Sequence, residues 1–206
     1  MKKYILLLLL FIASIGAGYG QLNKERQIEI FASASIDGTE FFIKITPGPD
    51  STKMTFKIRD SISVNLNNDK AYNTQRNYLL SLNSINLKND TVIKYLSILK
   101  SITEQYTFYS EDSIEIVNAA HKGYLHLINE VFNSTTDRLE NKNRFVMDGI
   151  FMSFTLTDKD STRKVNAFYP TEESNKMLYE LVTGSTSIYR LTKKNNFLDK
   201  RKLFGY

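Results

Sequence analysis

The feature that most constrains the fold is a strict alternation of apolar and polar residues in the first part of the chain. Residues 27–36 and 39–46 alternate on either side of Asp37-Gly38, a dipeptide that suits a two-residue hairpin because both positions tolerate positive φ. A third alternating stretch, 53–66, follows a proline-rich break. Alternation puts every second side chain on one face, so the pattern predicts three antiparallel strands with one buried and one wetter face.

The apolar spacing then changes to steps of three and four residues, which predicts three helices. The first covers about 78–85, and the second starts at Asn89 or Asp90 and extends to about 102. Asp112 and Glu115 have the spacing of a capping box. They predict a third helix that runs from there to about 131, with an extension toward 141.

Alternation returns in residues 144–158 and 163–169, which predicts two more strands, the first with a bulge at Asp148-Gly149. A last helix is predicted to begin at 170–173, where acidic residues suit the first turn, and to end near Gly184. The predicted order is βββ-ααα-ββ-α. It indicates an α+β fold: a single domain with a mostly antiparallel sheet of about five strands and helices packed on one face.

The first 20 residues have the three parts of a secretory signal peptide. Lys2 and Lys3 precede an apolar run over 4–12, and small residues follow over 13–20. We therefore expect residues 1–20 to be removed and residues 21–206 to form a single globular domain. The chain has no cysteine, so we expect no disulfide and no N-terminal lipid anchor. The sequence thus predicts a soluble exported protein, periplasmic or extracellular.

The C-terminal segment, 193–206, is basic in a chain whose formal net charge is +5. A solvated tail is the simpler interpretation, and the alternative is peripheral contact with an anionic surface such as a membrane. An exported protein rarely meets nucleic acid, so we expect no nucleic-acid partner. The basic residues concerned are Lys193, Lys194, Lys200, Arg201 and Lys202.

Few residues are candidates for catalysis. His121 and His126 are the only histidines, and a spacing of five residues places them on different sides of a helix, unlike a zinc-binding pair. His121 falls on the apolar stripe of the predicted third helix, which favours a hydrogen-bonded core histidine over a catalytic base. Asp148 is the one acid at a buried position of an apolar strand, so burial would perturb its pKa most.

Asp148 and His121 are therefore the weak catalytic candidates. The sequence has no cysteine nucleophile, no G-x-S-x-G elbow and no phosphate-binding loop. We expect neither a cofactor nor a metal.

Five segments read Asp-Ser/Thr followed by an apolar residue or threonine. The pattern resembles the three-residue acceptor of some bacterial envelope O-glycosylation systems, although Asp and Ser/Thr also gather at caps and turns. The candidate glycosylation sites are Ser51, Ser61, Thr91, Ser113 and Ser161.

Aromatic residues are frequent, with 13 Phe and 12 Tyr. Phe42 and Phe168 lie opposite the apolar set of their strands. They either form a ligand or partner patch on an open sheet face or lie under helices that cover both faces, and the second interpretation is favoured. With no catalytic constellation, the sequence favours a non-catalytic binding module of the immunity-protein, inhibitor or envelope-accessory kind, whose partner is another protein or an envelope component. The alternative is a glycan- or wall-directed hydrolase that uses carboxylates near His121.

Overall fold

The computed structural model describes residues 26–34, 38–81, 89–140, 149–159, 161–199, 203 and 205–206. Six strands form one sheet in the order β4-β3-β2-β1-β5-β6, and every neighbouring pair is antiparallel. The strands are β1 (Gln27–Ala34), β2 (Glu40–Pro47), β3 (Ser51–Ile62), β4 (Thr107–Val117), β5 (Ile150–Asp158) and β6 (Ser161–Phe168). The α+β class and the antiparallel sheet are thus confirmed. The predicted leader, residues 1–20, lies outside the described residues.

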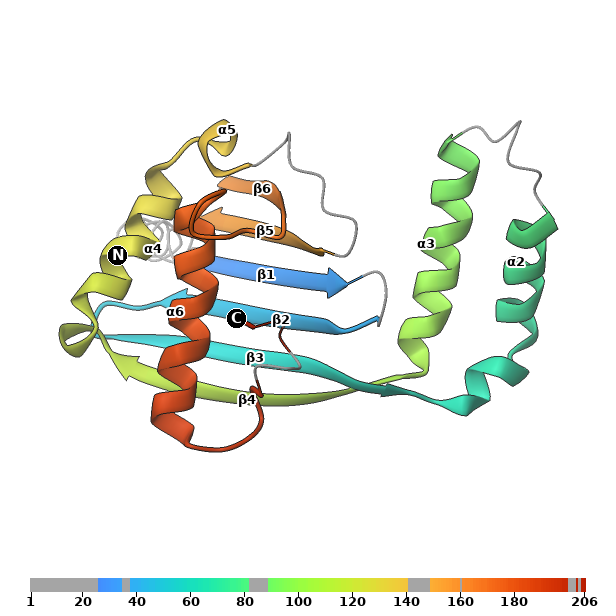
Figure 1. The fold of residues 1–206 in the computed structure, drawn as a ribbon, viewed down its shortest axis with the longest axis horizontal. Coiled ribbons are helices and arrows are strands. Elements are labelled where there is room, and N and C mark those ends of the chain that lie inside the picture. Colours follow the sequence, from blue (N-terminus) through green and yellow to red (C-terminus); the bar gives the residue numbers. More distant parts are fainter. Residues whose placement is uncertain are drawn as a thin grey trace, which may run out of the picture.

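The helices fall into two groups (Figure 1). One group covers a face of the sheet and comprises α4 (Lys122–Asn133), α5 (Thr136–Leu139) and α6 (Lys176–Lys193). The other group is a hairpin beyond the strand ends, made of α2 (Lys70–Ser81) and α3 (Asn89–Gln105). Two short 3-10 turns, η1 (Val64–Asn68) and η2 (Asn118–Ala120), lead into α2 and α4.

The hydrophobic core lies between the sheet and the α4–α6 group. Because strand side chains alternate, one parity of each strand points inward, and Ile28, Ile43 and Phe56 are at most 1% exposed. Ile128 of α4 and Leu181 of α6 meet them from the helical layer. Burial of one such side chain contributes about 1.5–3 kcal/mol, so the alternation decides which face of the sheet is covered.

The stretch with the capping-box spacing lies in strand β4, and the helix predicted there is wrong. Ile114 and Ile116 are buried and paired in register with β3. Asp112 and Glu115 therefore match a helix start only locally, while pairing with the 12-residue β3 buries the isoleucines in the core. Helix α4 begins at Lys122, and the sheet has six strands rather than about five.

The last helix begins and ends later than predicted. Residues 170–173 lie in a turn region, and α6 starts after Asn175, whose side chain caps it by accepting from the Leu178 N–H. The helix continues through Gly184. A Cβ at Gly184 would lie 3.3 Å from the ring of Tyr124 on α4, so this glycine allows close helix packing and does not end the helix.

Candidate functional site

The structure places only one of the two candidate catalytic residues. His121 lies between η2 and α4 and is half-buried. Its backbone N–H donates to the Asn118 carbonyl oxygen at 3.1 Å. It is therefore not a core histidine on a helical stripe, because the helix begins one residue later. Asp148, with the predicted bulge, lies outside the described residues, so its pairing with His121 stays a prediction.

The basic C-terminal segment is not a solvated tail where it is described. Leu198, Leu203 and Tyr206 belong to the buried core, each at most 4% exposed. Lys193 forms an ion pair with Asp112 at 3.0 Å. Lys194 is the C-cap of α6, in the left-handed conformation. The other predicted surface contacts, Lys200, Arg201 and Lys202, lie outside the described residues.

A hollow of about 780 Å³ lies beside this segment. Glu172 and Glu173 line it together with three tyrosines. The ring of Tyr206 packs against those of Tyr169 and Tyr179 with centroids 6.2 and 6.0 Å away. The Tyr206 hydroxyl is buried and donates to the Pro170 carbonyl oxygen at 2.6 Å. These contacts hold the C-terminal segment on the body.

The candidate glycosylation sites differ in accessibility. Ser61, Ser113 and Ser161 are exposed, whereas Ser51 is half-buried and its hydroxyl donates to Glu115. The side chain of Thr91 lies outside the described part of the chain. Modification of any of these residues stays a prediction.

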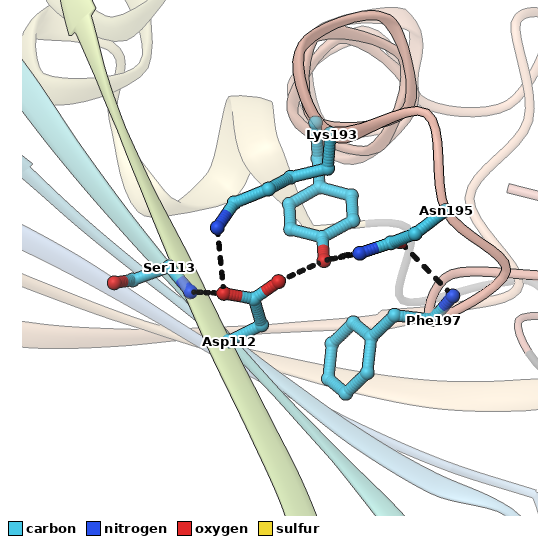
Figure 2. A network of polar contacts seen from close by, with 6 residues as sticks. Asp112, Ser113, Lys193, Asn195 and Phe197 are labelled. Carbon is cyan, nitrogen blue, oxygen red and sulfur yellow. Dashed lines mark hydrogen bonds and ion pairs between the residues drawn. The ribbon is translucent and has the colours of Figure 1, made fainter.

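A polar network joins strand β4 to the end of α6 (Figure 2). The Tyr189 hydroxyl donates to the Asp112 carboxylate, and the Lys193 ammonium binds the other carboxylate oxygen at 3.0 Å. The Asn195 amide donates to the Tyr189 hydroxyl at 3.3 Å. The Asn195 side-chain oxygen in turn accepts from the Phe197 N–H at 3.1 Å.

These contacts shift two titrations away from neutral pH. The hydrogen bond from Tyr189, supported by Lys193, lowers the pKa of Asp112 to about 2. Burial, with the bond to Asp112, raises the pKa of Tyr189 to about 12. A general acid or base works best with a pKa near the operating pH, so we interpret the network as a structural clamp that fixes α6 on β4.

The sheet face opposite the core carries a row of aromatic rings. Phe31 of β1 and Phe42 of β2 are cross-strand partners with centroids 4.9 Å apart. Phe42 also meets Tyr109 of β4 at 5.8 Å. Phe168 is 43% exposed and packs edge-on against Phe151 at 5.3 Å. The core position favoured for Phe42 and Phe168 is therefore wrong, because the α4–α6 group covers only the other face.

Two lysines lie over these rings. The Lys57 Nζ is 4.3 Å from the centroid of Tyr109 and 5.8 Å from that of Phe42. The Lys100 Nζ reaches from α3 to within 4.7 Å of the Phe31 centroid. Burial, with the nearby carboxylates of Glu40 and Glu104, raises the pKa of Tyr109, so its hydroxyl remains protonated at neutral pH.

Two shallow hollows lie on either side of Phe42. One, of about 360 Å³, extends over β1, β2, β5 and β6, and the other, of about 510 Å³, extends over β2, β3 and β4. Phe42 and Lys44 line both. We call this surface the open face and define it by Phe31, Phe42, Lys44, Lys53, Lys57, Tyr109, Phe151, Lys164 and Phe168.

The open face has an excess of unpaired positive charge. Its acids Glu29 and Glu40 form ion pairs with Lys44 and Arg59, both at 3.6 Å. Within the described ranges, three lysines of the face have no ion-pair partner. They are Lys53, Lys57 and Lys164. The face therefore offers aromatic rings beside cations that a ligand can still bind.

Part of this surface was hidden from sequence reasoning. Phe42 and Phe168 were detectable, because they break the apolar parity of their strands. Tyr109 was not, because β4 has helix-like spacing. Lys100 reaches the face only through the position of α3, which no local pattern gives.

Comparisons with models of protein families, with curated proteins and with solved structures find no match for this chain. No three His, Asp or Glu side chains gather as potential metal ligands within the described residues. No described helix combines the length and the apolar character that crossing a membrane requires. Geometry alone therefore selects the open face as the candidate site.

Proposed function

We propose that this protein is a non-catalytic binding module whose open face docks a partner protein. The observation that carries the proposal is the Phe31–Phe42–Tyr109 row, which the helical layer leaves uncovered and which Lys57 and Lys100 overlie. Aromatic residues are enriched at protein interfaces because a large ring buries area with little loss of conformational entropy. The features of residues 1–20 support action after export.

The sheet makes such a face rigid. Each open-face residue alternates with a buried one that anchors its strand: Phe42 lies between Phe41 and Ile43, both 1% exposed. A surface held in this way loses little freedom on binding, which favours affinity. The fold therefore supports recognition by a preformed surface.

The test compares two variants in a pull-down with chemical cross-linking from native extract of the producing cells. Phe31→Ser/Phe42→Ser removes two rings of the row. Leu191→Ser changes a 76% exposed apolar residue of α6 and serves as the control. We expect a stoichiometric partner with the native protein and with Leu191→Ser, and at least tenfold less with the double variant at an unchanged melting temperature.

Two results would contradict the proposal. Full retention of the partner by the double variant would place the binding site elsewhere. The absence of any cross-linked partner for folded native protein would remove the binding module altogether.

A further inference from the structure

Exposed apolar side chains concentrate on and around the α2–α3 hairpin. BUR-type surface exposure above one third marks ten large apolar residues among those described, and seven of them lie in the segment 62–108. Helix α2 has no buried residue. A hairpin of two helices buries little apolar surface by itself, so this one presents apolar surface to solvent. The seven residues are Ile62, Val64, Tyr78, Leu80, Ile93, Leu96 and Phe108.

One face of α3 looks toward the open face. The Lys100 ammonium lies over Phe31 at 4.7 Å, which fixes the direction of this side of the helix. Ile93 and Leu96 lie seven and four residues before Lys100, so all three share one side of α3. Ile93 is 63% and Leu96 is 53% exposed. The side that points to the sheet is thus apolar and uncovered.

The facing end of the sheet is apolar as well. Figure 1 shows the β1 arrow pointing toward α3, which runs across the strand ends from the β4 side toward the β6 side. The register places Phe151 opposite Ser33, near that end of β1, and Phe168 opposite Phe151. Phe31, Phe151 and Phe168 therefore lie at the end of the open face nearest to α3.

Charge selects the kind of occupant. The cations without an ion-pair partner in the described chain, Lys53, Lys57 and Lys164, lie on the same open face. Complementary charge steers a partner and excludes a basic one. An occupant must therefore carry acidic groups beside apolar side chains.

We propose that an acidic, amphipathic segment of the partner protein lies across the open face and against α3, with its apolar side on Ile93, Leu96, Phe151 and Phe168 and its carboxylates on Lys57 and Lys164. This inference rests on the proposed function and specifies the chemistry of the partner. The hairpin then acts as a second wall of the binding surface, because α3 and the sheet contact the same segment.

The experiment uses a photo-crosslinking phenylalanine analogue at one position at a time in the full-length protein. The test positions are Leu96 on α3, Phe168 at the near end of the sheet and Phe42 at its centre. Leu191 and Val117, exposed at 76% and 63%, are control positions. Each protein is irradiated in native extract, and mass spectrometry identifies the cross-linked peptides.

We expect positions 96 and 168 to cross-link neighbouring residues of one partner peptide that is rich in Asp or Glu beside apolar residues, with no such product from the controls. Lys57→Glu/Lys164→Glu should reduce that product at least tenfold, and Lys122→Glu/Lys176→Glu, of equal charge change on α4 and α6, should not.

The position of failure separates the two proposals. Cross-linking from position 42 without cross-linking from 96 leaves the binding module standing and overturns the role of α3. Products that join two copies of this chain, a lipid, or a peptide without acidic residues overturn the acidic segment. No product from any test position overturns both proposals.

Discussion

The two faces of the single sheet share one alternating pattern but carry different chemistry. The covered face is mainly aliphatic, and its side chains, such as Ile43 and Met54, are at most 1% exposed. The open face pairs aromatic rings with lysines and leaves them half-exposed. Alternation therefore defines a sheet with two distinct faces, and only the identity of the polar-parity residues distinguishes a solvated face from a binding face.

The largest expected contrast is between two phenylalanines on opposite faces. Phe56 is 1% exposed and packs on Tyr189 with centroids 4.8 Å apart, so Phe56→Ala should lower the free energy of unfolding by about 3–5 kcal/mol. Phe42→Ala should cost under about 1 kcal/mol. Urea denaturation measures both, and equal losses would show that the open face is not open.

The next contrast lies within the helical layer. Gly184→Val places methyl groups against the Tyr124 ring, which a Cβ alone would approach to 3.3 Å, and should destabilise by about 1–3 kcal/mol. Gly123→Ala is the matched control, because a Cβ at Gly123 has no neighbour within 4 Å. It should stabilise the helix by about 0.5 kcal/mol. Thermal denaturation compares the two variants, and a neutral Gly184→Val would contradict the close packing of α4 and α6.

The clamp at the edge of the covered face makes stability depend on pH. The pKa of Asp112 is lowered to about 2 in the folded state, so the unfolded chain binds a proton more readily and stability falls as the pH drops from about 4 to 2. Because the carboxylate is partly exposed, its contribution is about 1 kcal/mol after screening. Asp112→Asn should remove this difference.

The opposite limb belongs to Tyr189, whose pKa is raised to about 12. The unfolded chain loses this proton first, so stability should also fall as the pH rises from 10 toward 12. Denaturation at several pH values measures both limbs, with Glu173→Gln as the control for an exposed acid. A native protein whose acid limb matches that of Asp112→Asn would rule out the clamp.

The smallest effect concerns the cations of the open face. A double-mutant cycle of Lys57→Met and Tyr109→Leu should give a coupling of about 0.5 kcal/mol, the value of an exposed cation–π contact. Lys164→Met with Tyr109→Leu is the control pair and should show no coupling. A coupling of zero for Lys57 would mean that its ammonium is already free, which would leave the charge of the face unchanged but not its geometry.

Much of the fold could be predicted from the sequence, because local periodicity reports burial directly. The strands β1, β2, β5 and β6 have apolar residues at every second position, and α3 starts at Asn89 as expected. Strand β4 could not be predicted, since Asp112 and Glu115 imitate a helix start. Its strand state depends on β3, a partner that is distant in sequence.

The candidate site was predicted only in part. The aromatic residues at polar parity pointed to Phe42 and Phe168, but whether a helix covers them depends on how the layers stack. The placement of α3, and with it Lys100, depends on a hairpin inserted between two paired strands. Such long-range geometry has no signature in a local window.

Hydroxyl-radical footprinting tests the open face most directly, because aromatic side chains oxidise readily where solvent reaches them. In the free protein we predict oxidation of Phe42, Tyr109 and Phe168, with Phe56 and Phe154 unoxidised. Once the partner is bound, the open-face residues should become protected while Leu191 does not change. Open-face rings that resist oxidation in the free protein, or that oxidise equally in the complex, would contradict a binding role for this face.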